Sequence, residues 1–119
     1  MPQIKIKRVY DDPEKSDGYR ILVDRLWPRG IKKECLQYDE WAKEITPSPR
    51  LRSWFHNDIS GHWEEFTSMY REELSHSEAV KTFLSRIKSF PTVTLLYASK
   101  ESTHNHARIL QEYLEKKLS

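Results

Sequence analysis

The sequence has little of several things that would indicate a particular class of protein. It contains one cysteine, Cys35, in 119 residues, which excludes an internal disulfide and a purely cysteine-based zinc site. A single thiol fits a reducing compartment, so we predict a cytoplasmic protein. No run approaches the roughly 18 apolar residues of a membrane span. The first residues alternate charged and apolar side chains, and this pattern predicts no signal peptide.

Familiar catalytic motifs are also missing. There is no G-x-G-x-x-G, Walker A, G-x-S-x-G or H-E-x-x-H pattern in a chain with only three glycines. No spacing of potential ligands indicates a metal site, and we predict neither a metal nor another cofactor. The net charge of +2 is too small to indicate nucleic acid by itself. The charge is uneven, however, because residues 1–33 hold nine Lys and Arg against five Asp and Glu.

Three segments have the pattern of β-strands. Residues 3–9 alternate between apolar and charged side chains, and their lysines are typical of an edge strand. Residues 19–25 and 93–98 have consecutive apolar residues at their centres, which is typical of strands buried on both faces.

Several helices are predicted from caps and from apolar stripes. Ser48 before Pro49 indicates a helix start. A stripe at offsets 0, 3, 7 and 11 predicts a helix over residues 61–74. An S-x-x-E capping box at residues 75–78 predicts a further helix that ends near Ser89. The last helix is predicted over residues 106–118.

The segment between Gly30 and Thr46 is harder to interpret. Residues 31–36 are expected to form a short helix, and residues 39–45 another. Trp41 and Ile45 are four residues apart and would share one face of the second of these helices.

This order of elements predicts one α/β domain over residues 1–119. We expect a small, mainly parallel, Rossmann-like sheet of three or four strands, covered by helices on both faces. Such sheets bind ligands beyond the carboxyl ends of their strands. The loops that begin at Tyr10, Arg25 and Ala98 are therefore expected to converge.

The stretch Asp24-Arg25-Leu26-Trp27-Pro28-Arg29-Gly30 is the main candidate site. Two guanidinium groups on a stiff turn can hold a phosphate or a carboxylate, so Arg25 and Arg29 are candidate ligand-binding residues. The alternative is that they form structural ion pairs with Asp24, Asp11 or Asp12. Trp27 is a further candidate, either stacking on a ligand or packing in the core.

The start of the last helix supplies a second group of candidates. Asn105 and His106 lie where free N–H groups favour an anion, although Asn105 alone would serve as a plain cap. His106 is the candidate catalytic residue, because histidine exchanges a proton near neutral pH. Tyr97 ends the preceding strand and is expected to reach the same site.

With these residues in view, the chain resembles domain-of-unknown-function family 488, in particular its short bacterial, YeaO-like members. The segments that carry the resemblance are Lys5-Ile6-Lys7-Arg8-Val9-Tyr10-Asp11, Gly18-Tyr19-Arg20, Val23 with the Asp24-to-Gly30 stretch, Trp54-Phe55-His56, Leu95-Leu96-Tyr97-Ala98 and Asn105-His106-Ala107. The resemblance implies a compact α/β domain with parallel strands and no established activity. Longer members carry cysteine at position 97 and Cys-His-Arg at 105–107, and only His106 matches these four residues.

The favoured hypothesis is a site for an anionic small molecule, such as a nucleotide or a sugar phosphate, with catalysis left open. A nucleic-acid-binding or regulatory module is the first alternative, but the predicted helix over residues 61–74 is acidic on its open face. A protein-interaction module is the second alternative, weakly supported by the many aromatic residues.

Overall fold

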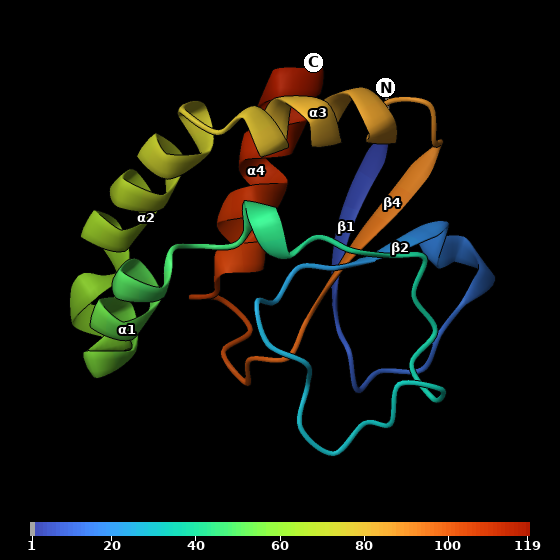
Figure 1. Ribbon diagram of the computed structural model, residues 1–119, viewed down its shortest axis with the longest axis horizontal. Helices are drawn as coiled ribbons and strands as arrows, with labels where there is room; N and C mark the ends of the chain where they lie inside the picture. The colour runs from blue at the N-terminus through green and yellow to red at the C-terminus, as the bar shows by residue number, and fades with distance from the viewer. Residues whose placement is uncertain (1) are drawn as a thin grey trace.

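The computed structural model describes residues 2–119 and contains one four-stranded sheet in which every pairing is parallel (Figure 1). The strands lie in the order β1-β4-β2-β3. They are β1 (Gln3–Arg8), β2 (Tyr19–Leu22), β3 (Glu40–Trp41) and β4 (Thr92–Tyr97). The predicted small parallel α/β fold is confirmed, and β1 is an edge strand as its lysines indicated.

Four α-helices complete the fold. They are α1 (Pro49–Asn57), α2 (Ile59–Ser75), α3 (Glu78–Ile87) and α4 (His106–Leu118). The hydroxyl oxygens of Ser48 and Ser77 accept from Leu51 and Val80 at the starts of α1 and α3. The start of α3 therefore uses Ser77 and not the predicted box at Ser75, which is the last residue of α2. Within residues 2–119, no helix has both the length and the apolar character needed to cross a membrane.

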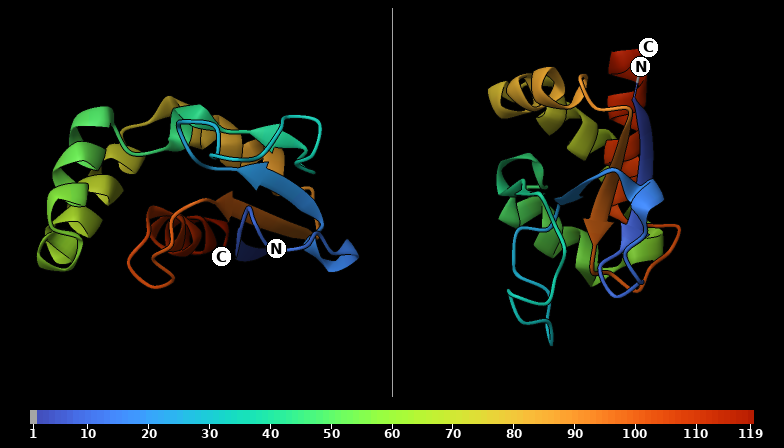
Figure 2. Two further views of the ribbon diagram at one scale, coloured as in Figure 1. Left: turned by 90° about the horizontal axis from the view of Figure 1, so that it is seen from below. Right: turned by 90° about the vertical axis from the view of Figure 1, so that its right-hand side faces the viewer.

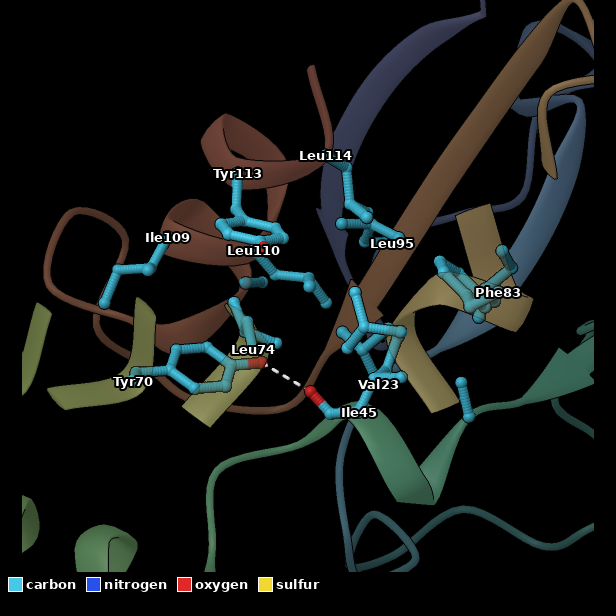
Figure 3. Close-up of a cluster of buried hydrophobic side chains, with 14 of the residues drawn as sticks. Val23, Ile45, Tyr70, Leu74, Phe83, Leu95, Ile109, Leu110, Tyr113 and Leu114 are labelled. Carbon is cyan, nitrogen blue, oxygen red and sulfur yellow. Dashed lines mark hydrogen bonds between the residues drawn. The ribbon is translucent and has the colours of Figure 1, made fainter. Parts of the chain in front are cut away.

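All four α-helices contribute to the larger hydrophobic cluster on one face of the sheet. Figure 3 shows Leu110 and Leu114 of α4 facing Leu95 of β4. The α1–α2 pair stands beside α4 and away from the strands (Figures 1 and 2). The buried Tyr70 hydroxyl of α2 donates to the carbonyl of Ile45 at 2.7 Å, which joins this pair to the segment that follows β3.

The other face of the sheet is buried without an α-helix. It is covered by the 3-10 helix η1 (Lys15–Asp17) and by the segment between β2 and β3. A smaller apolar cluster forms there around Leu22 and Leu96, with Leu36 and Trp27 packed against it. The predicted cover by helices on both faces therefore holds with α-helices on one face only; within residues 2–119, the second face carries the short 3-10 helix η1.

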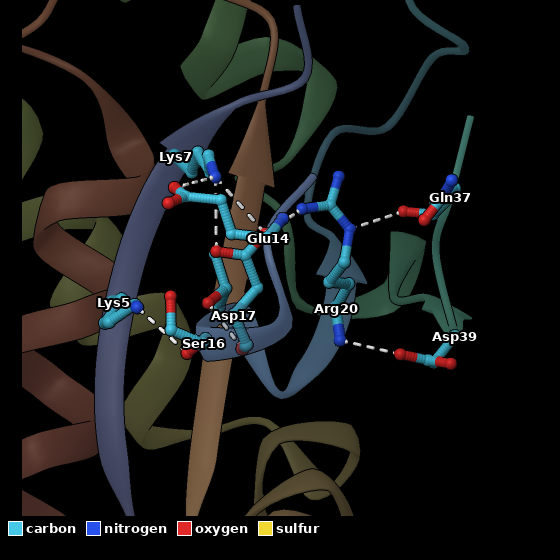
Figure 4. A network of polar contacts seen from close by, with 9 residues as sticks. Lys5, Lys7, Glu14, Ser16, Asp17, Arg20, Gln37 and Asp39 are labelled. Carbon is cyan, nitrogen blue, oxygen red and sulfur yellow. Dashed lines mark hydrogen bonds and ion pairs between the residues drawn. The ribbon is translucent and has the colours of Figure 1, made fainter. Parts of the chain in front are cut away.

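A polar network on this second face is centred on Asp17, which is 1% exposed (Figure 4). Its carboxylate accepts from Arg20 and, at 3.2 Å, from Lys7. Burial alone would raise the pKa of Asp17, but hydrogen bonds from the Glu14 N–H, Lys7 and Arg20 outweigh it and hold the pKa below its ordinary value. The Thr94 hydroxyl donates to the Asp17 carbonyl at 2.7 Å, so the network ties η1 to β4.

The helices predicted at residues 31–36 and 39–45 are wrong. Residues 31–38 are irregular, with a turn at 33–35, and Glu40–Trp41 is strand β3, followed by the 3-10 helix η2 (Lys43–Ile45). Trp41 joins the smaller apolar cluster and Ile45 the larger one, so the two side chains do not share a face.

Candidate functional site

The carboxyl ends of the strands open onto a pocket of about 340 Å³. Tyr10, the stretch from Asp24 to Arg29 and the segment from Ala98 all contribute to its lining, so the three predicted loops do converge. Two further walls come from α1 and from the first half of α2. The site therefore lies where the sheet meets the α1–α2 pair.

Arg25 and Arg29 both line this pocket without forming the ion pairs considered above. Within residues 2–119, neither guanidinium pairs with a carboxylate. Arg25 Nη2 donates weakly to the Pro47 carbonyl at 3.3 Å, and its buried Nε has no hydrogen-bond partner in the described chain. The Tyr10 hydroxyl donates to the Arg29 carbonyl at 2.9 Å, which holds the turn against the end of β1.

Trp27 packs in the core and also lines the pocket. Its Nε1 donates to the Ile31 carbonyl at 2.6 Å, and its ring packs edge-on against Tyr38 and Trp41. The indole is therefore anchored in the smaller apolar cluster while it forms part of the pocket wall.

Among residues 2–119, Asp24 is the one carboxylate in the lining, and both of its oxygens are already engaged. Oδ2 accepts from the Ala98 N–H at 2.9 Å, and Oδ1 lies 3.3 Å from His106 Nε2. The same Nε2 lies 2.6 Å from the Val23 carbonyl. Because both neighbours are acceptors, Nε2 carries the proton, and the ring position is fixed by β2 and the turn that follows it.

Asn105 and Tyr97 differ in their relation to the pocket. Asn105 lines it but acts as the cap of α4: its Oδ1 accepts from Arg108 at 2.9 Å, and its Nδ2 donates to the Glu101 carbonyl at 2.8 Å. Tyr97 does not line the pocket. Its side chain lies on the same face of β4 as those of Val93 and Leu95, and it packs in the larger hydrophobic cluster. Burial raises the pKa of the Tyr97 hydroxyl.

Three basic residues of the lining were missed by sequence reasoning: Arg52, His56 and His104. Arg52 and His56 are one turn apart on α1, a spacing that places them on one helix face. Partial burial, then the charge of Arg52 and then that of His106, lower the pKa of His56. His104 packs against Trp63 of α2 with ring centroids 4.8 Å apart.

The arrangement suits an anion better than a metal. Three arginines and three histidines line the pocket with a single engaged carboxylate. Within residues 2–119, no group of three or more His, Cys, Asp and Glu side chains is placed to hold a metal ion.

Residues 3–119 match the family described as the inactive DUF488-N3 subclade. The chain belongs to the DUF488 family. It is 51% identical over 111 residues to the uncharacterised protein YeaO of Escherichia coli, covering 93% of this chain and 96% of that one. It is 37% identical over 112 residues to an uncharacterised protein of Mycobacterium tuberculosis, covering 94% and 93%. No solved structure gives a significant match.

The match extends over almost the whole chain and confirms the predicted resemblance to the DUF488 family and its YeaO-like members. It therefore includes every residue of the pocket lining. The descriptions of the subclade and of these relatives name no ligand.

Proposed function

We propose that this DUF488 protein binds a small phosphate-bearing anion in the pocket between the sheet and α1. The observation that carries the proposal is the six basic side chains gathered around one carboxylate that is itself engaged. Arginine forks match the oxygens of phosphate, and a partly enclosed site weakens the competition from water.

The state of the arginines supports the proposal further. Arg29 and Arg52 make no side-chain hydrogen bond or ion pair within residues 2–119, and the buried Nε of Arg25 is unpartnered there. A bound anion would neutralise the mutual repulsion of the arginine guanidinium groups.

Binding without catalysis is the form of the proposal that we favour. His106, the candidate acid or base, already directs its Nε2 proton to the Val23 carbonyl and Asp24. The lining has no cysteine or engaged serine–histidine pair, and the subclade is described as inactive. His106 then acts as a fixed wall of the pocket, held in place by Asp24.

Replacing Arg52 with alanine is expected to weaken phosphate binding by about 10-fold to 100-fold, because one charged hydrogen bond contributes about 1.5–3 kcal/mol. Arg50→Ala is the matched control, since Arg50 is exposed on the same helix two residues earlier and lies outside the lining. Isothermal titration with inorganic phosphate and phenyl phosphate measures both. No binding to the unaltered protein, or equal losses in the two variants, would contradict a phosphate site at this position.

Sulfate binding is expected to strengthen roughly fivefold between about pH 8 and about pH 5.5, corresponding to about 1 kcal/mol for a partly exposed charge pair. In the ligand-free protein, the pKa of His56 is lowered by burial and by the charges of Arg52 and His106. A bound anion would raise this pKa again. Protonation of His56 and sulfate binding therefore favour one another as the pH falls. Sulfate is suitable because it does not titrate in this range.

Titrations of two histidine variants check this pH dependence. His56→Gln is expected to flatten it in part, while His76→Gln, at an exposed position between α2 and α3, leaves it unchanged. An affinity for sulfate that does not vary with pH, or that varies equally in the two variants, would count against a role for His56.

A further inference from the structure

Apart from the arginines and histidines, the polar side chains of the pocket lining make hydrogen bonds within residues 2–119. The donors of Tyr10, Trp27 and Thr46 point to backbone carbonyls at 2.9, 2.6 and 2.7 Å. Ser99 Oγ accepts from the Glu101 N–H at 3.1 Å. Both the oxygen and the nitrogen of the Asn105 side-chain amide make hydrogen bonds. The Asp24 carboxylate, which is charged, is engaged as well.

The groups that the pocket offers to a ligand are therefore its arginine and histidine side chains and its apolar surface. The apolar part comes from both sides. Leu26, 64% exposed, and Trp27 belong to the turn after β2, and Ile59 comes from α2, whereas Phe55 and Phe66 are only 4% and 1% exposed and contribute little free surface. Phe55 and Phe66 are stacked with centroids 3.8 Å apart and form a rigid aromatic base.

Because its neutral polar groups are engaged, leaving mainly basic and apolar groups to a ligand, the pocket is expected to bind some kinds of phosphate ester more tightly than others. A ligand with many hydroxyl groups would lose hydrogen bonds to water when it enters the pocket. The neutral polar side chains there already bond within the protein, so they would not replace the lost hydrogen bonds. A ligand with an apolar body would instead gain from burial against leucine and aromatic side chains.

We propose that the natural ligand is an amphipathic phosphate: a phosphoryl group carried on a compact, apolar body, rather than a sugar phosphate. The inference rests on the proposed function, since it names the ligand class of the same pocket. A volume of about 340 Å³ is at the small end for ligand sites, which limits the ligand to the size of a small metabolite.

Calorimetric titration with three probes tests this inference: inorganic phosphate, glucose 6-phosphate and phenyl phosphate. Phenyl phosphate is expected to bind at least about tenfold more tightly than either of the others, because it alone buries an apolar ring. Glucose 6-phosphate is expected to bind no better than inorganic phosphate. Leu26→Ser is expected to reduce the affinity for phenyl phosphate about threefold and to leave inorganic phosphate unchanged.

The matched control is Met69→Ser, since Met69 is also an exposed apolar residue, at 47%, but lies on α2 outside the lining. Glucose 6-phosphate binding as tightly as phenyl phosphate, both depending on Arg52, would overturn the inference and leave the proposed function standing. Equal effects of Leu26→Ser and Met69→Ser would also overturn it. Failure of all three probes to bind would overturn the proposed function itself.

Discussion

Replacing Asp17 with asparagine is expected to lower the free energy of unfolding by about 3–5 kcal/mol, the range for removing one partner of a buried ion pair. The Asp17 carboxylate is 1% exposed and accepts from both Lys7 and Arg20. Asparagine keeps the size of the side chain but not the charge, so Arg20 would remain buried without a counter-charge and Lys7 would keep only the exposed Glu14. Urea unfolding of the two proteins measures the difference.

Glu14→Gln is the matched control, because Glu14 is the other carboxylate bound to Lys7, at 2.8 Å, and its side chain is 66% exposed. Water screens this pair, so its loss is expected to change stability by less than about 1 kcal/mol. Similar losses in the two variants would mean that burial of Asp17 does not determine its contribution.

The pH dependence of stability provides a second measure of Asp17. Its folded-state pKa lies below the ordinary value of 3.8, so its contribution is present above that pH and is lost as the pH falls through the folded-state pKa. Asparagine does not titrate, and the difference in stability between the two proteins is therefore expected to narrow below about pH 4. A constant difference down to lower pH would argue against an ionised Asp17 in the folded protein.

The parts of the fold that the sequence predicts well are those with strong local patterns. The consecutive apolar residues around Ile21 and Leu95 predict buried strands because both faces of the sheet are covered. Ser48 and Asn105 mark helix starts because their side chains accept from backbone N–H groups that would otherwise have no partner.

Strand β3 was missed because its structure depends on distant residues. Its two residues pair with Ile21 and Leu22 of β2, and the Ala42 N–H donates to the Leu22 carbonyl at 2.8 Å. Locally, the spacing of Trp41 and Ile45 favours a helix. Pairing with β2 outweighs that preference, which is the usual limit of local propensity in short strands.

The candidate site shows the same division between local and distant information. Arg25 and Arg29 could be predicted because they directly follow a recognisable strand. Arg52 and His56 could not, since their place depends on how α1 packs beside the sheet. The i, i+4 spacing shows that they share a helix face, but no sequence pattern indicates that this face closes a pocket.

Gly18→Ala is expected to lower the free energy of unfolding by about 2–6 kcal/mol, the sum of about 1–3 for a strained backbone and about 1–3 for overpacking. Gly18 has φ 65° and ψ −130°, a conformation available mainly to glycine. A Cβ atom here would lie 2.3 Å from the Thr92 carbonyl oxygen at the start of β4. That atom belongs to the backbone of the central sheet, so relief requires a shift of η1 or of β4.

Gly30→Ala separates the two contributions, because Gly30 also has a positive φ of 78° but has no atom within 4 Å of the added Cβ. It is expected to lower stability by about 1–2 kcal/mol, the penalty of the left-handed conformation alone. Urea unfolding of both variants therefore measures the close approach of η1 to β4 as the excess loss in Gly18→Ala. Equal losses would show that η1 moves away from β4 freely, and the Asp17 network that joins them would then be weaker than its burial indicates.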